Sequence, residues 1–516
     1  MITEFLAVAA VFIGGCATMR NLGLIGWGLA PLGFLAGICL QLGIGLLQVA
    51  MALPTSPVIT LTLTVGLPVA WWIARWRRGH QAAVSAPLAV ASLAGLAVAV
   101  VALRTENLAK WHNDSLAYLM AGRLIAEGEY RSTASTLLVT TRALGVPLLH
   151  APANLDNGLY LRSVTPLLTA ATLASVIWFL MRGARRGIGN ARLATFAALA
   201  VLLLLTNNRF IFSFFYLNGH LLFAAMVLLI VASGWLLVVG DRAPNRALMV
   251  LQIMAIPALV ITRPEGSIMG LLVLLPTWLS ERIPRRHRSI TMAVLGGTTV
   301  LYSGFQGWVF LDRDTELPPS VSGLFLLGIV VLLSIPVLWW TFVPRHAKQV
   351  LWLTEAGLWL ALLALALRSP ATLGSSVYAT YVNVFRGAGG WGLSIVALAA
   401  ALLVVCALRS FRVPYQAALR FPLTTFVPLV FLLAYLRGGA YRPGDSDSLN
   451  RMVMHVVPLA VLLLFLLLTN GDLPSPTPVD DVRGQARLRE ATSPAESLDE
   501  DVKPTPSLTG PSSGPG

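Results

Sequence analysis

The chain has 516 residues, of which 56% are hydrophobic and 12% are charged, and its mean hydropathy is +0.75. A water-soluble fold of this length needs far less apolar surface, so the composition excludes an ordinary soluble domain and predicts a protein embedded in a bilayer. The net charge of +14 does not indicate a nucleic-acid partner, because the basic residues form short clusters between apolar runs rather than one basic face.

Apolar runs close to the length of a membrane crossing recur along the whole chain, and charged breaks divide them into about fifteen predicted spans. The first run follows no basic segment, so we expect a retained span rather than a cleaved signal peptide. The predicted fold class is all-α, a polytopic transmembrane helical bundle. The spans are expected at 5–19, 23–52, 57–74, 84–103, 161–181, 192–206, 219–240, 246–262, 265–280, 289–310, 320–343, 349–367, 391–408, 421–436 and 452–469.

The basic clusters fall on one side when alternate connections are assigned to the two membrane faces. By the positive-inside rule this side is cytoplasmic. Only two acids, Asp241 and Glu281, share it, so acidic side chains concentrate on the opposite, outer face. The clusters are RWRR (75–78), RGARR (182–186), DRAPNR (241–246), ERIPRRHR (281–288), PRHAK (344–348) and RSFRVPYQAALR (409–420).

Four parts follow from this reading: N-terminal transmembrane helices at 1–103, a long outer loop at 104–160, a transmembrane core at 161–470 and a tail at 471–516. The tail is rich in Pro, Ser and Gly and has too little apolar surface for a core, so we expect it to be disordered and cytoplasmic. The protein is therefore expected in the cell membrane with its chemistry on the outer side.

The long outer loop contains WHNDSLAYLMAGRLIAEGEY (111–130). Apolar residues recur at helical spacing over 115–127, and Gly128 predicts the end of a helix. Such an amphipathic helix would lie along the membrane interface. The apolar positions are Leu116, Leu119, Met120 and Leu124.

Asn113 or Asp114 begins this helix, where the helix dipole keeps a carboxylate ionised. An ionised carboxylate at the mouth of a membrane cavity can act as a general base that deprotonates an acceptor hydroxyl during attack on a sugar carbon. The alternative is that Asp114 only caps the helix, which stabilises it by roughly 1 kcal/mol.

Arg263 and Glu265 lie between two predicted spans in ITRPEGSIMG (261–270), close to the hydrophobic boundary. Charges at that depth are costly and are usually paired or functional. The arginine could hold a lipid phosphate while Glu265 orients it. The alternative is an ordinary arginine that reaches to the interface beside a helix started by proline.

A group of charged residues precedes the last span, in LRGGAYRPGDSDSLNRMVMHVVPL (436–459). Arg451 and His455 are four positions apart and share one helix face. Guanidinium and imidazole groups facing one cavity suit a phosphate leaving group, whose charge grows as the sugar departs. The alternative is a solvated turn. The group comprises Arg437, Arg442, Asp445, Asp447, Arg451 and His455.

These motifs together, NDSLAYLMAGRLIAEG, then TRPEG, then RPGDSDSLNRMVMHVVP, resemble the GT-C superfamily of polytopic glycosyltransferases. The likeness is to bacterial relatives of the protein mannosyltransferase and aminoarabinose transferase group, over about 104–270 and the last outer loop. It implies inverting sugar transfer from a polyprenyl-phosphate donor, with Asp114 as the catalytic acid/base. It also implies donor-phosphate binding by Arg263, Arg442, Arg451 and His455, with Glu265, Asp445, Asp447 and Tyr118 in support.

The sequence departs from that pattern at two points. The catalytic loop of the family follows the first span, whereas about four predicted spans precede it here. Many relatives also carry two adjacent acids where this chain has Asn113 and Asp114. We therefore assign no metal and no cofactor, and a divalent metal stays an open alternative.

The expected partners are the lipid-linked donor, an acceptor that is a glycan, lipid or protein, and membrane lipid. A transporter or a flippase for lipid-linked substrates is the main rival hypothesis, since many spans with a few buried charges describe it too. Transporters usually carry repeats and broken helices around a midplane site. A membrane scaffold without chemistry is the third hypothesis, and it predicts that Asp114 could be lost without consequence.

Overall fold

The computed structural model describes residues 2–51, 53, 56–76, 86–104, 113–130, 143–184, 188–239, 245–312, 316–339, 346–409, 417–436, 441–444 and 447–470. Within these ranges all regular structure is helical and no β-strand occurs, which confirms the all-helical fold class. The tail predicted at 471–516 and the predicted site residue Asp445 lie outside the described residues.

Each apolar run singled out in the sequence is a helix. In chain order these are α1 (Ile2–Asn21), α2 (Leu29–Ala50), α3 (Pro57–Trp76), α4 (Ala86–Arg104), α8 (Val164–Gly183), α9 (Asn190–Leu205), α11 (Gly219–Val239), α12 (Arg246–Thr262), α13 (Gly266–Trp278), α14 (Arg285–Leu311), α15 (Pro319–Leu333), α17 (Ala347–Arg368), α19 (Leu393–Arg409), α20 (Ala417–Leu436) and α22 (Val457–Asn470). The amphipathic segment of the outer loop is α5 (Asn113–Ala126).

Short helices that the apolar pattern does not predict connect these elements. They are α7 (Gly145–His150), η1 (Ala151–Asp156), α10 (Asn208–Phe212), η2 (Ile335–Trp339), α18 (Pro370–Thr380), the π-helical turn η3 (Tyr381–Phe385), α21 (Ser448–Met452) and η6 (Val453–His455). Most lie beside the polar groups described below, so they matter for the site more than for the bundle.

Eight of the described helices are long and apolar enough to cross a membrane: α1, α2, α3, α8, α11, α15, α17 and α20. A ninth span results if the helices on either side of a 43° bend, Ser448–His455 and Val457–Asn470, are counted as one. Five further apolar helices, in α4, α9, α12, α13 and α19, are shorter. The count of about fifteen spans therefore stays a prediction.

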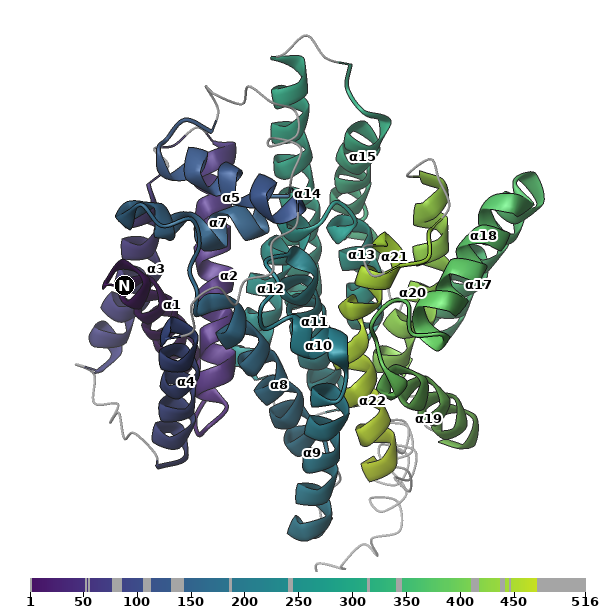
Figure 1. Cartoon of the computed structure of the whole chain (residues 1–516), viewed down its shortest axis with the longest axis horizontal. Helices are drawn as coiled ribbons and strands as arrows, with labels where there is room; N and C mark the ends of the chain where they lie inside the picture. The colour runs from purple at the N-terminus through teal and green to yellow at the C-terminus, as the bar shows by residue number, and fades with distance from the viewer. Residues whose placement is uncertain are drawn as a thin grey trace, which may run out of the picture. The chain divides into compact units, whose positions relative to one another are not determined.

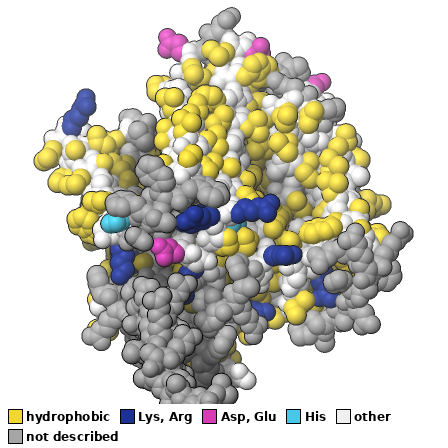
Figure 2. All heavy atoms as spheres, turned by 180° about the vertical axis from the view of Figure 1, so that it is seen from behind, with side chains coloured by type: hydrophobic (Ala, Val, Ile, Leu, Met, Phe, Trp, Pro, Cys, Tyr) yellow, Lys and Arg dark blue, Asp and Glu magenta, His cyan; other side chains and the backbone are white. Residues whose placement is uncertain are grey.

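Large apolar side chains cover much of the surface, as expected where a protein meets lipid. Leu333 on α15, Leu367 on α17 and Leu403 on α19 are each more than 70% exposed. Figure 2 shows hydrophobic side chains over the upper part of one face, above a band of Lys and Arg side chains. This distribution agrees with a membrane protein.

The most buried N-terminal helix is α2, which packs against α1, α8 and α12. Its GFLAG motif places Gly33 and Gly37 on the side that meets α1. A Cβ at Gly37 would collide with the carbonyl of Val11, and one at Gly33 with Cys16. Glycines four apart let two membrane helices approach closely, and here they join α1 to the bundle.

Figure 1 shows α5 and α7 lying across the upright helices near one end of α2. The two short helices pack on each other, α5 also packs on η1, and α7 packs on α2. The bundle thus holds the outer-loop helix in a fixed place.

Candidate functional site

Four connections that the sequence analysis assigns to the same membrane face converge in the structure. They are the start of α5, the segment before α11, the break between α12 and α13, and the bend before α22. Their polar side chains form one group, called here the polar cluster: Asp114, Tyr118, Tyr216, His220, Arg263, Glu265, Arg451 and His455.

Asp114 and Arg451 form the contact at the centre of the polar cluster. Arg451 Nη1 donates to Asp114 Oδ2 at 3.1 Å and lies 3.3 Å from the Tyr216 hydroxyl. The side chains of Asp114 and Arg451 are 21% and 13% exposed, so the pair is largely covered but still reachable. Such a charge-assisted bond is stronger in these surroundings than at an open surface.

The chain around Asp114 is fixed by its neighbour. The Ser115 hydroxyl donates to the carbonyl of Leu217 at 2.8 Å, which ties α5 to the segment before α11. The apolar stripe predicted for this helix coincides with its buried face only in part: Leu119 is buried, as are Ala121 and Ile125, whereas Leu116 and Met120 are about half exposed. The contact with α7 and η1 decides which face is covered, because small side chains allow the closest approach.

Arg263 is the first residue after the end of α12. Its backbone is extended, and Arg263 Nε donates to Glu265 Oε1 at 3.0 Å. The two side chains are 11% and 4% exposed. Thr262 just before it packs closely against Gly145 and Gly219, where a Cβ would lie 2.6 Å and 3.1 Å from the nearest Thr262 atom. Close packing thus fixes the backbone from which the Arg263 side chain extends, and its guanidinium interacts electrostatically with Asp114 and Tyr118.

His455 is linked to Arg263 through His220. It is 1% exposed, and its Nε2 is 2.9 Å from His220 Nδ1. His220 Nε2 in turn is 3.5 Å from Arg263 Nη1. His220 therefore lies between His455 and Arg263, and the phosphate contact expected for the buried His455 stays a prediction.

The other predicted residues of the last outer loop hold the backbone. Asp447 caps α21 by accepting from the amides of Asn450 and Arg442. Arg442 is exposed, and its carbonyl accepts from Asn383 at 3.1 Å. Neither contact brings these two residues into the polar cluster.

A second loop holds α21 in place. Asn450, one position before Arg451, is fully buried, and its side chain donates to the carbonyl of Gly389 at 2.9 Å and accepts from the indole of Trp391. Arg209 Nε donates to the same Gly389 carbonyl at 2.6 Å. The position of Arg451 thus depends on a glycine-rich segment far away in the sequence.

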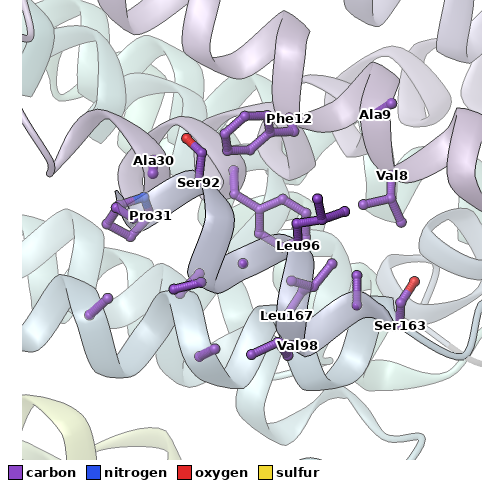
Figure 3. Close-up of a pocket in the computed structure, with 18 of the residues that line it drawn as sticks. Val8, Ala9, Phe12, Ala30, Pro31, Ser92, Leu96, Val98, Ser163 and Leu167 are labelled. Carbon is purple, nitrogen blue, oxygen red and sulfur yellow. The ribbon is translucent and has the colours of Figure 1, made fainter. Parts of the chain in front are cut away.

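Two apolar cavities flank α4, and the second of them adjoins the polar cluster. Cavity A, of about 420 Å³, is lined by α1, α2, α4 and α8, with Pro31 and Ser163 toward opposite ends in Figure 3. Cavity B, of about 370 Å³, lies between α4 and α8 and is lined also by Arg162, Phe214 and Leu217. Leu217 is the residue whose carbonyl accepts from Ser115, so cavity B adjoins the residues that carry Asp114 and Tyr216.

Two carboxylates, Asp114 and Glu265, and two guanidinium groups, Arg263 and Arg451, balance the formal charge of the polar cluster. Arg451 Nε is buried and has no hydrogen-bond partner among the described residues. The Arg451 side chain as a whole is 13% exposed, and a guanidinium suits an anion with several oxygens, such as a phosphate. Among the described residues, no three His, Cys, Asp or Glu side chains gather closely enough to hold a metal ion.

Sequence reasoning missed three members of this arrangement: Tyr216, His220 and Asn450. His220 opens an apolar helix and could have been noticed as a titratable group at a span boundary. Tyr216 and Asn450 carry no such signal, because ordinary polar residues in short connections are common.

Comparison with known proteins gives no family: no family model, no curated protein and no solved structure matches this chain. Since a fold alone does not determine function, the function has to be argued from the polar cluster and the two cavities.

Proposed function

We propose that this protein is an integral membrane glycosyltransferase that moves a sugar from a polyprenyl-phosphate donor to an acceptor at the outer face of the membrane. The observation that carries the proposal is the contact of Asp114 with Arg451. It joins a carboxylate suited to be a general base to a guanidinium suited to hold phosphate, beside a second buried Arg–Glu pair.

Each charged group named above has one role in the proposed reaction. The donor phosphate is bound by Arg451 and Arg263, and its oxygens compete with Asp114 for Arg451. Asp114, released from part of its ion pair, accepts the proton of the acceptor hydroxyl while that oxygen attacks the anomeric carbon. The bond from carbon to phosphate oxygen breaks, the configuration inverts, and the polyprenyl phosphate leaves with the two arginines stabilising its added charge.

Cavities A and B support a lipid-linked substrate rather than a soluble nucleotide sugar. Their linings are almost entirely apolar, and cavity B adjoins the residues around Asp114. An apolar cavity of this kind stays free of water and favours hydrocarbon. Cavity B would hold the first part of the prenyl chain, with Arg162 near the headgroup.

The finer topology belongs to the same proposal. About fifteen spans, a C-terminus inside and the polar cluster outside would follow from the basic connections. The exposed Leu116 and Met120 of α5 would then face lipid, which fits a helix lying along the interface.

The test is sugar transfer by purified protein in vesicles, with labelled polyprenyl-phosphate hexoses and pentoses and with lipid, glycan and protein acceptors. Wild type should transfer one of these sugars, and Asp114→Asn should lower the rate by roughly 10²–10⁴-fold, the usual worth of a general base. Glu127→Gln is the matched control, because it neutralises an exposed carboxylate on the same segment, one that pairs with exposed Arg123. No transfer from any donor, or full activity of Asp114→Asn, would overturn the proposal.

One observation favours a transporter or flippase as the second candidate. The segment Ser448–His455, which carries Arg451, meets α22 at an angle of 43°, and broken helices beside an anion site are typical of transporters. Sealed vesicles separate the two functions: a transporter moves the intact lipid-phosphate sugar across the bilayer, whereas the proposed enzyme consumes it.

A further inference from the structure

We propose that His220 and His455 are positioning residues: as a neutral pair with fixed tautomers, they hold the Arg263 guanidinium in the orientation in which Glu265 also contacts it. The inference deepens the proposed function, on which it rests in one respect: Arg263 matters here as a group that would bind the donor phosphate. The tautomers of the pair follow from its hydrogen bonds and surroundings alone.

The tautomers follow from the donors and acceptors. Arg263 is a donor only, and its Nη1 faces His220 Nε2 at 3.5 Å, so that nitrogen has to be the acceptor. The proton of neutral His220 is then on Nδ1 and is donated to His455 Nε2 at 2.9 Å. His455 Nε2 accepts, so the proton of His455 is on Nδ1 as well.

A charged form of either ring conflicts with this chain of contacts. A proton added to His220 Nε2 would face Arg263, placing two cations 3.5 Å apart. A second proton on His455 would require His220 Nδ1 to accept and would again turn the Nε2 proton toward Arg263. The ring of His455 also packs against Phe223 and is 1% exposed, and burial away from water disfavours an imidazolium.

The pair connects the arginine to the helix bundle. His220 opens α11 and His455 ends η6 at the bend before α22, and the two rings stack with centroids 5.1 Å apart. Glu265 holds Arg263 through Nε, whereas His220 accepts at Nη1. Two acceptors at different nitrogens fix the plane of a guanidinium, which decides whether it can meet a phosphate in a bidentate manner.

Matched substitutions separate the two roles of His220. In His220→Gln, Oε1 can take the place of Nε2 and accept from Arg263, whereas in His220→Asn the amide retains the donor toward His455 and loses that acceptor. For His455, Gln retains an acceptor at the position of Nε2, and Phe retains only the ring. All four variants are read by binding of geranyl phosphate, a short prenyl phosphate, to the full chain in detergent, with thermal unfolding as the check on folding.

We expect His220→Asn and His455→Phe to weaken geranyl phosphate binding roughly tenfold and the two Gln variants to remain close to wild type. Solid-state nitrogen NMR of histidine-labelled protein in bilayers should show both rings neutral and protonated on Nδ1, with assignments from the variants. Wild-type binding by His220→Asn, equal losses in the Asn and Gln variants, or a ring that is cationic or protonated on Nε2 would each overturn the inference. Neither readout uses sugar transfer, so a protein that binds geranyl phosphate with the expected pattern but transfers no sugar would defeat the proposed function alone.

Discussion

Arg451 and Asp114 are 337 positions apart in the chain, yet their side chains meet at 3.1 Å. With exposed fractions of only 13% and 21%, neither charge can be removed without leaving the other largely covered and without this ion pair. The pair therefore serves two purposes in our proposal. It joins α5 to α21 before a donor binds, and it gives way to the donor phosphate afterwards.

Replacing Arg451 should separate these purposes. Arg451→Met is expected to lower the free energy of unfolding by about 1–3 kcal/mol, because it removes the ion pair with the largely covered Asp114. Arg451→Lys retains the charge but loses the fork of donors, so stability should change less while the KM for the donor rises roughly tenfold. Thermal unfolding in detergent and steady-state kinetics measure the two effects.

A double-mutant cycle provides the control for that prediction. If the contact is direct, Asp114→Asn combined with Arg451→Met should cost less than the sum of the single changes, by about 1 kcal/mol or more. Additive costs, or an Arg451→Lys variant with the KM of wild type, would mean that the pair does not prepare the site for phosphate.

The loop before α19 supplies a prediction at a distance from the charges. A Cβ at Gly389 would collide with the Asn450 carboxamide and the Asn383 carbonyl, so Gly389→Ala should displace α21 and with it Arg451. We expect a loss of roughly tenfold in donor affinity together with a lower unfolding temperature. Gly374→Ala in α18, where a Cβ meets nothing within 4 Å, is the matched control and should behave as wild type. Equal behaviour of the two variants would contradict this support for Arg451.

Hydrophobic length predicts the large helices well, because each apolar run must satisfy its backbone hydrogen bonds internally in lipid, and a helix does so. The short elements follow from no such rule. The helix α7 and the turn η1 are built from GVPLLH and APANLD, whose helical form depends on packing beneath α5. Burial of α5 illustrates the same limit: the periodicity of Leu116 and Met120 predicts a helix correctly, but the partner decides which side is covered.

The grouping of Asp114, Arg263 and Arg451 could be anticipated from the sequence, since costly charges at span boundaries on one predicted face have reason to pair. The individual contacts of each residue could not be anticipated from the sequence. The sequence does not show that the Asp447 carboxylate caps α21, or that His220 lies between His455 and Arg263. Such details depend on short bends in the chain, such as the one before α22. A bend of this kind leaves no periodic signal in the sequence.

Acid should destabilise the contact between η1 and the segment before α8 through His150. This side chain is fully buried, and burial lowers its pKa from 6.5 to about 4. Its Nδ1 accepts from the amide of Leu161 at 3.2 Å. Since the folded pKa lies below the unfolded one, the stability is complete above about pH 6.5 and is lost as the pH falls toward 4, by at most about 3 kcal/mol.

His150→Asn removes the titration and keeps an acceptor near the position of Nδ1. Unfolding temperatures measured from pH 7 to pH 4 should therefore fall less steeply in this variant than in wild type, although its stability at pH 7 is expected to be somewhat lower because the smaller side chain packs less well. Parallel curves for the two proteins would show that His150 is not the group responsible.

Cavity B gives a prediction about the length of the lipid chain. Ala97 on α4 lines this cavity, and Ala97→Phe would fill part of it without touching the polar cluster. If prenyl chains occupy cavity B, the variant should lose affinity for a long-chain donor, by roughly tenfold for one or two displaced apolar groups, and should bind geranyl phosphate more nearly as wild type does. Ala89→Phe, the same change at an exposed position of the same helix, is the control. The comparison is informative because an effect on α4 packing alone would weaken both ligands equally, whereas a hydrocarbon cavity makes the loss grow with chain length.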